Sequence, residues 1–170
     1  MRNFIMSSFK RPAASLLAGC AVVIALWPQL LAAAQADGPF SIFGGDWKGV
    51  GSVVDDKGKT ESLRCRESNV VSDDNISLTQ SLVCASDSYR MEFHTTLFTD
   101  GHTVRGTWQD TSHDTGGNIF GQISHDAIIA TISAPGVRAR LSARTSATRQ
   151  EVTIEPEGTQ INKVVVTMEK

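Results

Sequence analysis

Hydrophobic and polar residues alternate on both sides of Asp100-Gly101, near the middle of the chain. Asp-Gly between two runs rich in aromatic and β-branched residues predicts a β-hairpin with a two-residue turn. Such a turn pairs Leu97 with Val104, and it places the apolar residues of both strands on one face. That face comprises Met91, Phe93, Leu97, Val104 and Trp108. The hairpin is therefore expected to bury one side and to expose the other.

The same alternation recurs along most of the chain, in short segments separated by turn residues. The predicted strands are 44–54, 60–71, 76–84, two strands within 89–108, 118–123, 127–132, 137–144, 150–155 and 161–168. Residues 109–117 are polar and predict a long loop. About ten short strands joined by tight turns predict an all-β, antiparallel up-and-down meander. We expect the meander to close or curl into a barrel, because an open sheet of this size leaves unpaired edges.

A disulfide follows from turn chemistry in the second and third strands. Asp74-Asn75, read as a two-residue turn, sets a register in which Cys65 lies opposite Cys84. Directly opposed residues are close enough for a disulfide. The register was obtained without reference to the cysteines, so the two observations support each other.

Turn chemistry sets further registers in the same way. The expected pairs are Leu82 with Met91, Ile123 with Ile128 and Leu141 with Val152. The last register places Arg138, Arg140 and Arg144 on the outer face of one strand, close to glutamates of the next. This stripe is either a surface for an anion or protein partner or a solvated charge ladder, and the ladder is the simpler interpretation.

Residues 1–36 are typical of a cleaved secretory signal peptide. Basic residues precede a long apolar run, which ends at the small-x-small site Ala34-Gln35-Ala36. An uncleaved membrane anchor is an alternative, since the run approaches the roughly 20 residues that span a bilayer. Lipidation at Cys20 is another, because Leu17-Ala18-Gly19-Cys20 fits a lipobox. The expected location is periplasmic or secreted, with a lipoprotein anchored through Cys20 as the alternative.

Residues 37–170 fit one domain. They contain all 18 acidic residues and all but three of the 16 basic residues, which gives a formal charge of −5. Such a charge argues against nucleic acid as a partner and against stable association with an anionic membrane. The two cysteines of this part are consistent with one disulfide formed in an oxidising compartment.

Gly45-Asp46-Trp47, at the head of the first strand, resembles the Gly-x-Trp signature of calycins. These are the lipocalin, fatty-acid-binding and avidin-like β-barrels. The resemblance covers this tripeptide and the length of the meander, and it implies a calycin-like barrel with a ligand held inside. The chain departs from lipocalins in having no helix after the last strands.

The inward-facing residues give the candidate ligand site. They are Trp47, Tyr89, Met91, Phe93, Trp108, Ile119 and Ile132. These side chains line either a cavity or a solid core, because a barrel of about eight strands is just filled by its side chains and a wider one leaves room. The predicted function is binding of a small apolar or amphiphilic ligand. The alternative is a ligand-free envelope interaction or structural module acting through rim loops and the outer Arg stripe.

Catalysis and metal binding have weaker support in the sequence. Four histidines are present, and His113 with Asp114, and either Asp110 or His125, could form a metal site at one rim. Polar turn residues explain the same pattern. Ser112, His113 and Asp114 are consecutive and point in different directions, so they cannot form a catalytic relay. We therefore expect a protein that is not an enzyme and that needs no metal and no cofactor.

Overall fold

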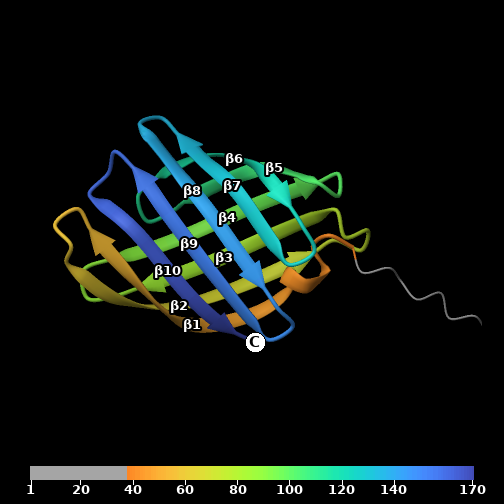
Figure 1. Cartoon of the computed structure of the whole chain (residues 1–170), viewed down its shortest axis with the longest axis horizontal. Helices are drawn as coiled ribbons and strands as arrows, with labels where there is room; N and C mark the ends of the chain where they lie inside the picture. The colour runs from red at the N-terminus through yellow and green to blue at the C-terminus, as the bar shows by residue number, and fades with distance from the viewer. Residues whose placement is uncertain (1–37) are drawn as a thin grey trace, which may run out of the picture. The chain divides into compact units, whose positions relative to one another are not determined.

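The structure is a computed structural model that describes residues 38–170, so the predicted signal peptide and the Cys20 alternative lie outside the described residues. A short 3₁₀ helix, η1 (Ser41–Phe43), precedes ten antiparallel strands. The strands are β1 (Gly45–Asp55), β2 (Thr60–Val71), β3 (Ser77–Ala85), β4 (Arg90–Thr99), β5 (Thr103–Asp110), β6 (Thr115–Ile123), β7 (Ala127–Ala134), β8 (Val137–Thr145), β9 (Arg149–Glu157) and β10 (Ile161–Glu169). Each strand pairs with its neighbours in sequence, and β10 returns to β1 (Figure 1). The predicted all-β meander closed into a barrel is confirmed.

The seam between β1 and β10 depends on glycine. Gly49 lies opposite Met168, and Gly51 lies opposite Val166. A Cβ atom on Gly49 would clash with the carbonyl oxygen of Thr167. The two backbones therefore approach closely at these glycines, and this close approach allows the last strand to pair with the first.

Two of the predicted registers are confirmed. Cys65 lies opposite Cys84, and the two residues form a disulfide with a Cα–Cα distance of 4.1 Å. Ile123 lies opposite Ile128, across a two-residue turn at His125-Asp126 that is closed by a hydrogen bond from Ser124 N to Ala127 O.

Three registers differ from the predictions, each by two residues. Leu97 pairs with Gly106 instead of Val104. The turn is wider than predicted because the Asp100 carboxylate accepts hydrogen bonds from the backbone N–H of His102 at 3.0 Å and of Thr103 at 2.7 Å. Thr99 pairs with Val104, so four residues lie between the last paired residues, where the Asp-Gly dipeptide predicts two.

The other two differences have a similar cause. Leu82 pairs with Phe93 and Leu141 with Ile154. In both connections the turn lies one residue later in the chain than predicted, and a serine hydroxyl closes it. Ser86 Oγ accepts a hydrogen bond from the N–H of Tyr89 at 2.9 Å, and Ser146 Oγ accepts one from the N–H of Arg149 at 3.1 Å. A shift of two residues leaves every side chain on its predicted face, so the barrel interior is unaffected.

The predicted loop at 109–117 is wrong. Asp110 and Thr115 pair as the last residues of β5 and β6, so the connection contains only 111–114. Gly117 lies within β6, where a Cβ atom would clash with the carbonyl oxygen of Ser133. Gly117 therefore allows two neighbouring strands to approach closely and does not mark a loop.

One end of the barrel is closed by the segment before β1. Phe40 and Phe43 are buried there, with their rings in an edge-to-face contact at 6.4 Å between centroids. The Trp47 indole N–H donates to the carbonyl oxygen of Phe43 at 3.1 Å. The opposite end carries the β1–β2, β3–β4, β5–β6, β7–β8 and β9–β10 connections. Within residues 38–170, no helix is long and apolar enough to cross a membrane.

Candidate functional site

The barrel interior contains two chambers. The outer chamber, of about 480 Å³, extends to the connections β3–β4, β5–β6, β7–β8 and β9–β10. The inner chamber, of about 90 Å³, lies toward the end closed by Phe43. The sequence left cavity and solid core as alternatives, and the structure shows a cavity.

The outer chamber is lined almost entirely by apolar side chains. Its wall includes Cys84, Met91, Ala139, Val164, Val166 and Met168. Tyr89, Met91, Val137 and Ile154 point inward but are only half-buried, because they face this space instead of a packed core. An open apolar cavity of this size is typical of small-molecule sites.

The two chambers meet at a waist, defined here as the residues that line both. They are Leu82, Phe93, Trp108, Ile132, Val152 and Ile154. The rings of Phe93 and Trp108 lie 5.9 Å apart between centroids. An elongated molecule in the outer chamber would meet this aromatic pair before it reached the inner chamber.

The predicted ligand-site residues fall into three groups. Tyr89 and Met91 line the outer chamber, and Ile119 lines the inner one. Phe93, Trp108 and Ile132 belong to the waist.

Trp47 lines neither chamber, and its assignment to the ligand site is wrong. The side chain is fully buried beside the seam, bonded to the carbonyl oxygen of Phe43. The Lys170 ammonium lies 4.6 Å from its ring centroid. Trp47 therefore belongs to the packed core that supports the barrel wall.

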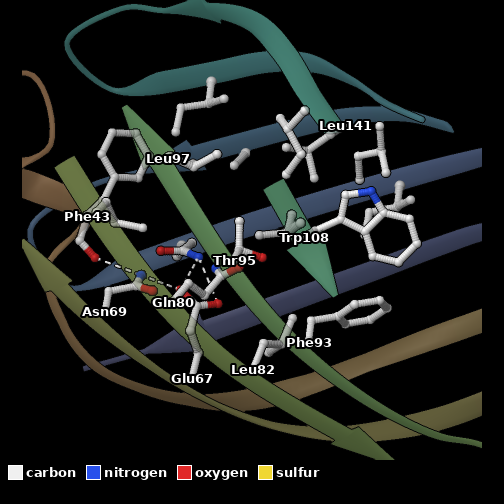
Figure 2. Close-up of a pocket in the computed structure, with 18 residues that line it drawn as sticks. Phe43, Glu67, Asn69, Gln80, Leu82, Phe93, Thr95, Leu97, Trp108 and Leu141 are labelled. Carbon is white, nitrogen blue, oxygen red and sulfur yellow. Dashed lines mark hydrogen bonds between the residues drawn. The ribbon is translucent and has the colours of Figure 1, made fainter. Parts of the chain in front are cut away.

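Polar side chains form one wall of the inner chamber. They are Glu67, Asn69, Gln80, Thr95 and Gln150, contributed by β2, β3, β4 and β9. Figure 2 shows Glu67, Asn69, Gln80 and Thr95 grouped on one side of this chamber, with Trp108 and Phe93 on the other. An apolar outer chamber thus leads to a polar inner end.

Glu67 is the centre of this polar wall, and only 4% of its surface is exposed. The Gln150 amide donates to both carboxyl oxygens, at 3.0 and 3.3 Å, and the Asn69 amide donates to Oε1. Burial raises the pKa of the Glu67 carboxyl above its ordinary value of 4.5, while the hydrogen bonds from Gln150 and Asn69 act in the opposite direction.

Two buried polar atoms of the inner chamber lack a partner among the described residues. Asn69 donates to Glu67 and to the carbonyl oxygen of Phe43, but its Oδ1 accepts no hydrogen bond. The Trp108 indole N–H, at the waist, donates to none. Unsatisfied buried groups are rare in folded proteins because each costs about 1–3 kcal/mol. Both atoms are therefore available to a bound molecule.

None of the residues predicted for the ligand site belongs to this polar wall. Period-two alternation in the second strand places Glu67 and Asn69 on the same face as Leu63, Cys65 and Val71. That pattern was sufficient to put a carboxylate and an amide inside the barrel.

The mouth of the outer chamber carries one imidazole–carboxylate pair. His113 Nδ1 lies 2.7 Å from the Asp110 carboxylate, which is itself buried and accepts from the N–H of Ser112 at 2.9 Å. His125 occupies the β6–β7 turn at the other end of the barrel. No group of three potential metal ligands occurs among residues 38–170, so His125 does not join His113 in the metal site considered from the sequence.

The arginines of β8 lie opposite glutamates of β9. Arg138 pairs with Glu157, Arg140 with Glu155 and Arg144 with Glu151 in the register of the two strands. Alternating charges on a solvated face are typical of a cross-strand ladder. This arrangement supports the simpler of the two interpretations of the Arg stripe.

No protein-family model matches the chain, and no curated protein matches it in sequence. Similar folds occur among solved structures. Rv2717c from M. tuberculosis has a TM-score of 0.62 at 12% identity, over 77% of this chain and 94% of its own. The S-type phycobiliprotein lyase CPES from Guillardia theta has a TM-score of 0.54 at 12% identity, over 76% and 88%.

A protein of unknown function from the DUF3598 family of Nostoc punctiforme has a TM-score of 0.55 at 12% identity, over 77% of this chain and 48% of its own. The fold is calycin-like. The expectation drawn from Gly45-Asp46-Trp47 and the length of the meander is confirmed at this level. At these identities, the calycin-like neighbours carry information on fold alone.

Proposed function

We propose that this calycin-like barrel binds a small, largely apolar molecule in its outer chamber and acts as a binding protein rather than an enzyme. The observation that carries the proposal is the open apolar chamber of about 480 Å³. Its walls offer dispersion contacts and release of water as the main driving forces.

The expected affinity follows from burial. Each methylene that moves from water into such a chamber contributes about 0.8 kcal/mol, so roughly ten methylenes contribute about 8 kcal/mol before the cost of association. A barrel that is already formed in the absence of ligand keeps that cost low. Dissociation constants in the micromolar range are the natural expectation for an unspecialised apolar ligand.

The fold neighbours allow both binding and catalysis. One of them is named as a phycobiliprotein lyase, so an activity beyond binding has a precedent on this fold. The His113–Asp110 pair is the one imidazole–carboxylate pair at the mouth of the outer chamber. We place this pair at the rim as a structural contact that holds the β5–β6 connection, and replacement of His113 by Ala should leave ligand binding intact.

The rival function is protein interaction through the rim or the Arg stripe. Glutamates of β9 lie opposite these arginines in the strand register, and this mixture of charges weakens the stripe as a surface for an anionic partner. The ligand-binding proposal has the stronger support. A hollow interior loses the dispersion contacts that a filled core would make, and a purely structural barrel gains nothing from that loss.

Tryptophan fluorescence tests the proposal directly. Trp108 lines the chambers and Trp47 does not, so a bound ligand should perturb Trp108 alone. Titration with fatty acids, retinoids and haem should give saturable quenching that is lost in Trp108→Phe and retained in Trp47→Phe. Absence of any saturable response across the panel would contradict the proposal.

A matched pair of variants locates the site. Val152→Phe fills the waist and should weaken binding by at least about tenfold. Val50→Phe makes the same change on the outer face, where the side chain is 66% exposed, and should leave binding unchanged. Equal effects of the two variants would place the ligand outside the barrel.

We also propose that the protein is exported, as the signal-like leader and the cysteine pair predict. The Cys65–Cys84 disulfide supports an oxidising compartment, because thiols stay reduced in most cytosols.

A further inference from the structure

The inner chamber contains a buried acid without a counter-ion. Glu67 forms no ion pair within residues 38–170, and among the residues that the structure describes no Lys, Arg or His lines this chamber. A buried carboxylate that lacks a positive partner is costly, and proteins usually pair such groups. The hydrogen bonds from the neutral amides of Gln150, Asn69 and Gln80 supply only part of that compensation.

A second, independent observation points to the same kind of missing partner. Asn69 Oδ1 is buried in a residue that is only 6% exposed, and it accepts no hydrogen bond. The donors that reach the Glu67 carboxylate are the neutral amides of Gln150, Asn69 and Gln80, so no positive charge faces it. The same wall therefore holds one acceptor without a donor, Asn69 Oδ1, and one carboxyl group without a positive partner, Glu67.

The chamber has room for a head group but not for a chain. About 10–15 Å³ of such volume already admits a water molecule, and the inner chamber has about 90 Å³. The apolar outer chamber begins at the waist, where Phe93 and Trp108 lie. A molecule that fills both chambers is therefore apolar over most of its length and ends in a small polar group.

We propose that the inner chamber binds the protonated amino group of an amphiphile whose apolar part occupies the outer chamber. The ammonium group carries three donors and no acceptor, which suits Glu67 and Asn69 Oδ1. It also supplies the charge that Glu67 lacks. A carboxylate head group is disfavoured because it brings a second negative charge to a buried site with no cation. The inference rests on the proposed apolar site and names the ligand class for it.

Calorimetric titration of the mature protein with three molecules of equal chain length tests this proposal. Octylamine, octanol and octanoate share the apolar part and differ only in the head group. Octylamine should bind at least about tenfold more tightly than octanol, and octanoate more weakly than either. Amine binding no tighter than alcohol binding would overturn the inference and leave the apolar site standing, whereas failure of all three to bind would overturn both.

Variants of Glu67 separate recognition from folding. Glu67→Gln keeps the size and an acceptor oxygen but removes the charge, so the preference for octylamine should vanish while octanol still binds. Glu151→Gln removes a carboxylate from the exposed face of β9, next to Gln150 in sequence, and should keep the full preference. An octylamine preference that survives Glu67→Gln would contradict the role of Glu67.

The pH dependence gives a further readout. Among residues 38–170, Glu67 is the only ionisable residue that lines the inner chamber. Octylamine stays protonated well above neutral pH. The amine preference should therefore decline as the pH falls and Glu67 takes up a proton, and a preference that persists unchanged in acid would count against the ion pair.

Discussion

Glu67 shows how a single residue on an inward face changes the chemistry of the whole interior. The strand that carries it alternates regularly, and its neighbours Cys65 and Leu63 are buried core residues. One carboxyl group in this series, with Asn69 two positions on, gives an apolar barrel a polar end. The pattern of the sequence places the residue, but it cannot indicate that Gln150 arrives from β9 to donate to it.

The raised pKa of Glu67 has a consequence for stability. A carboxyl group whose pKa is higher in the folded state keeps its proton where the unfolded chain has lost it. Its contribution to stability is therefore fully present below the ordinary value of 4.5 and is lost as the pH rises through the folded value. Glu67→Gln should become progressively more stable than the wild type as the pH rises through this window.

Urea unfolding over a series of pH values measures this difference. Glu151→Gln, which removes an exposed carboxylate, should follow the wild type at every pH. A constant difference between Glu67→Gln and the wild type would show that the carboxyl group has the same pKa in the folded and unfolded states.

At the scale of strands, the faces were predictable and several registers were not. Alternation assigns each side chain to the inside or the outside, and this assignment survived in all three strand pairs whose register was wrong. The registers failed where a side chain widened or moved the turn, as Asp100 and Ser86 do. Such local hydrogen bonds are not visible in the composition of a dipeptide. The disulfide was predictable because its turn set the register correctly.

The Cys65–Cys84 bond joins β2 to β3 across a loop with a sequence separation of 19. Replacement of both cysteines by Ser should lower the free energy of unfolding by roughly 2–4 kcal/mol and leave the fold intact. Chemical denaturation with far-UV circular dichroism measures both effects. Reduction of the wild-type protein is the matched control, since it breaks the bond without placing hydroxyls in the core, and thiol reagents should not label the protein before reduction.

At the scale of the barrel, the seam between β1 and β10 decides whether the sheet closes. Gly49→Ala should lower the free energy of unfolding by about 1–3 kcal/mol, because a Cβ atom there forces the two backbones apart. Ser52→Ala, on the same strand, should have little effect. Urea denaturation of both variants tests this expectation, and equal stabilities would mean that the seam tolerates a wider spacing.

The start of the mature chain is also a property of the whole molecule. If the predicted signal peptide is cleaved, intact mass or N-terminal sequencing should give Asp37 as the first residue, as the Ala34-Gln35-Ala36 site predicts. A mass that includes a diacylglyceryl group on Cys20 would instead place the barrel on a membrane.

Closure of the barrel through β1 and β10 also sets the order in which the protein can fold. Gly49 pairs with Met168, 119 positions later in the chain, whereas every other strand pairs with its immediate neighbours in sequence. Hairpins between neighbouring strands form early because they close short loops. The pairing of β1 with β10 forms last because it closes the longest loop in the barrel. The chain thus stays without a finished interior chamber until its final strand has been made, so the proposed ligand can be enclosed only after synthesis of the last residues.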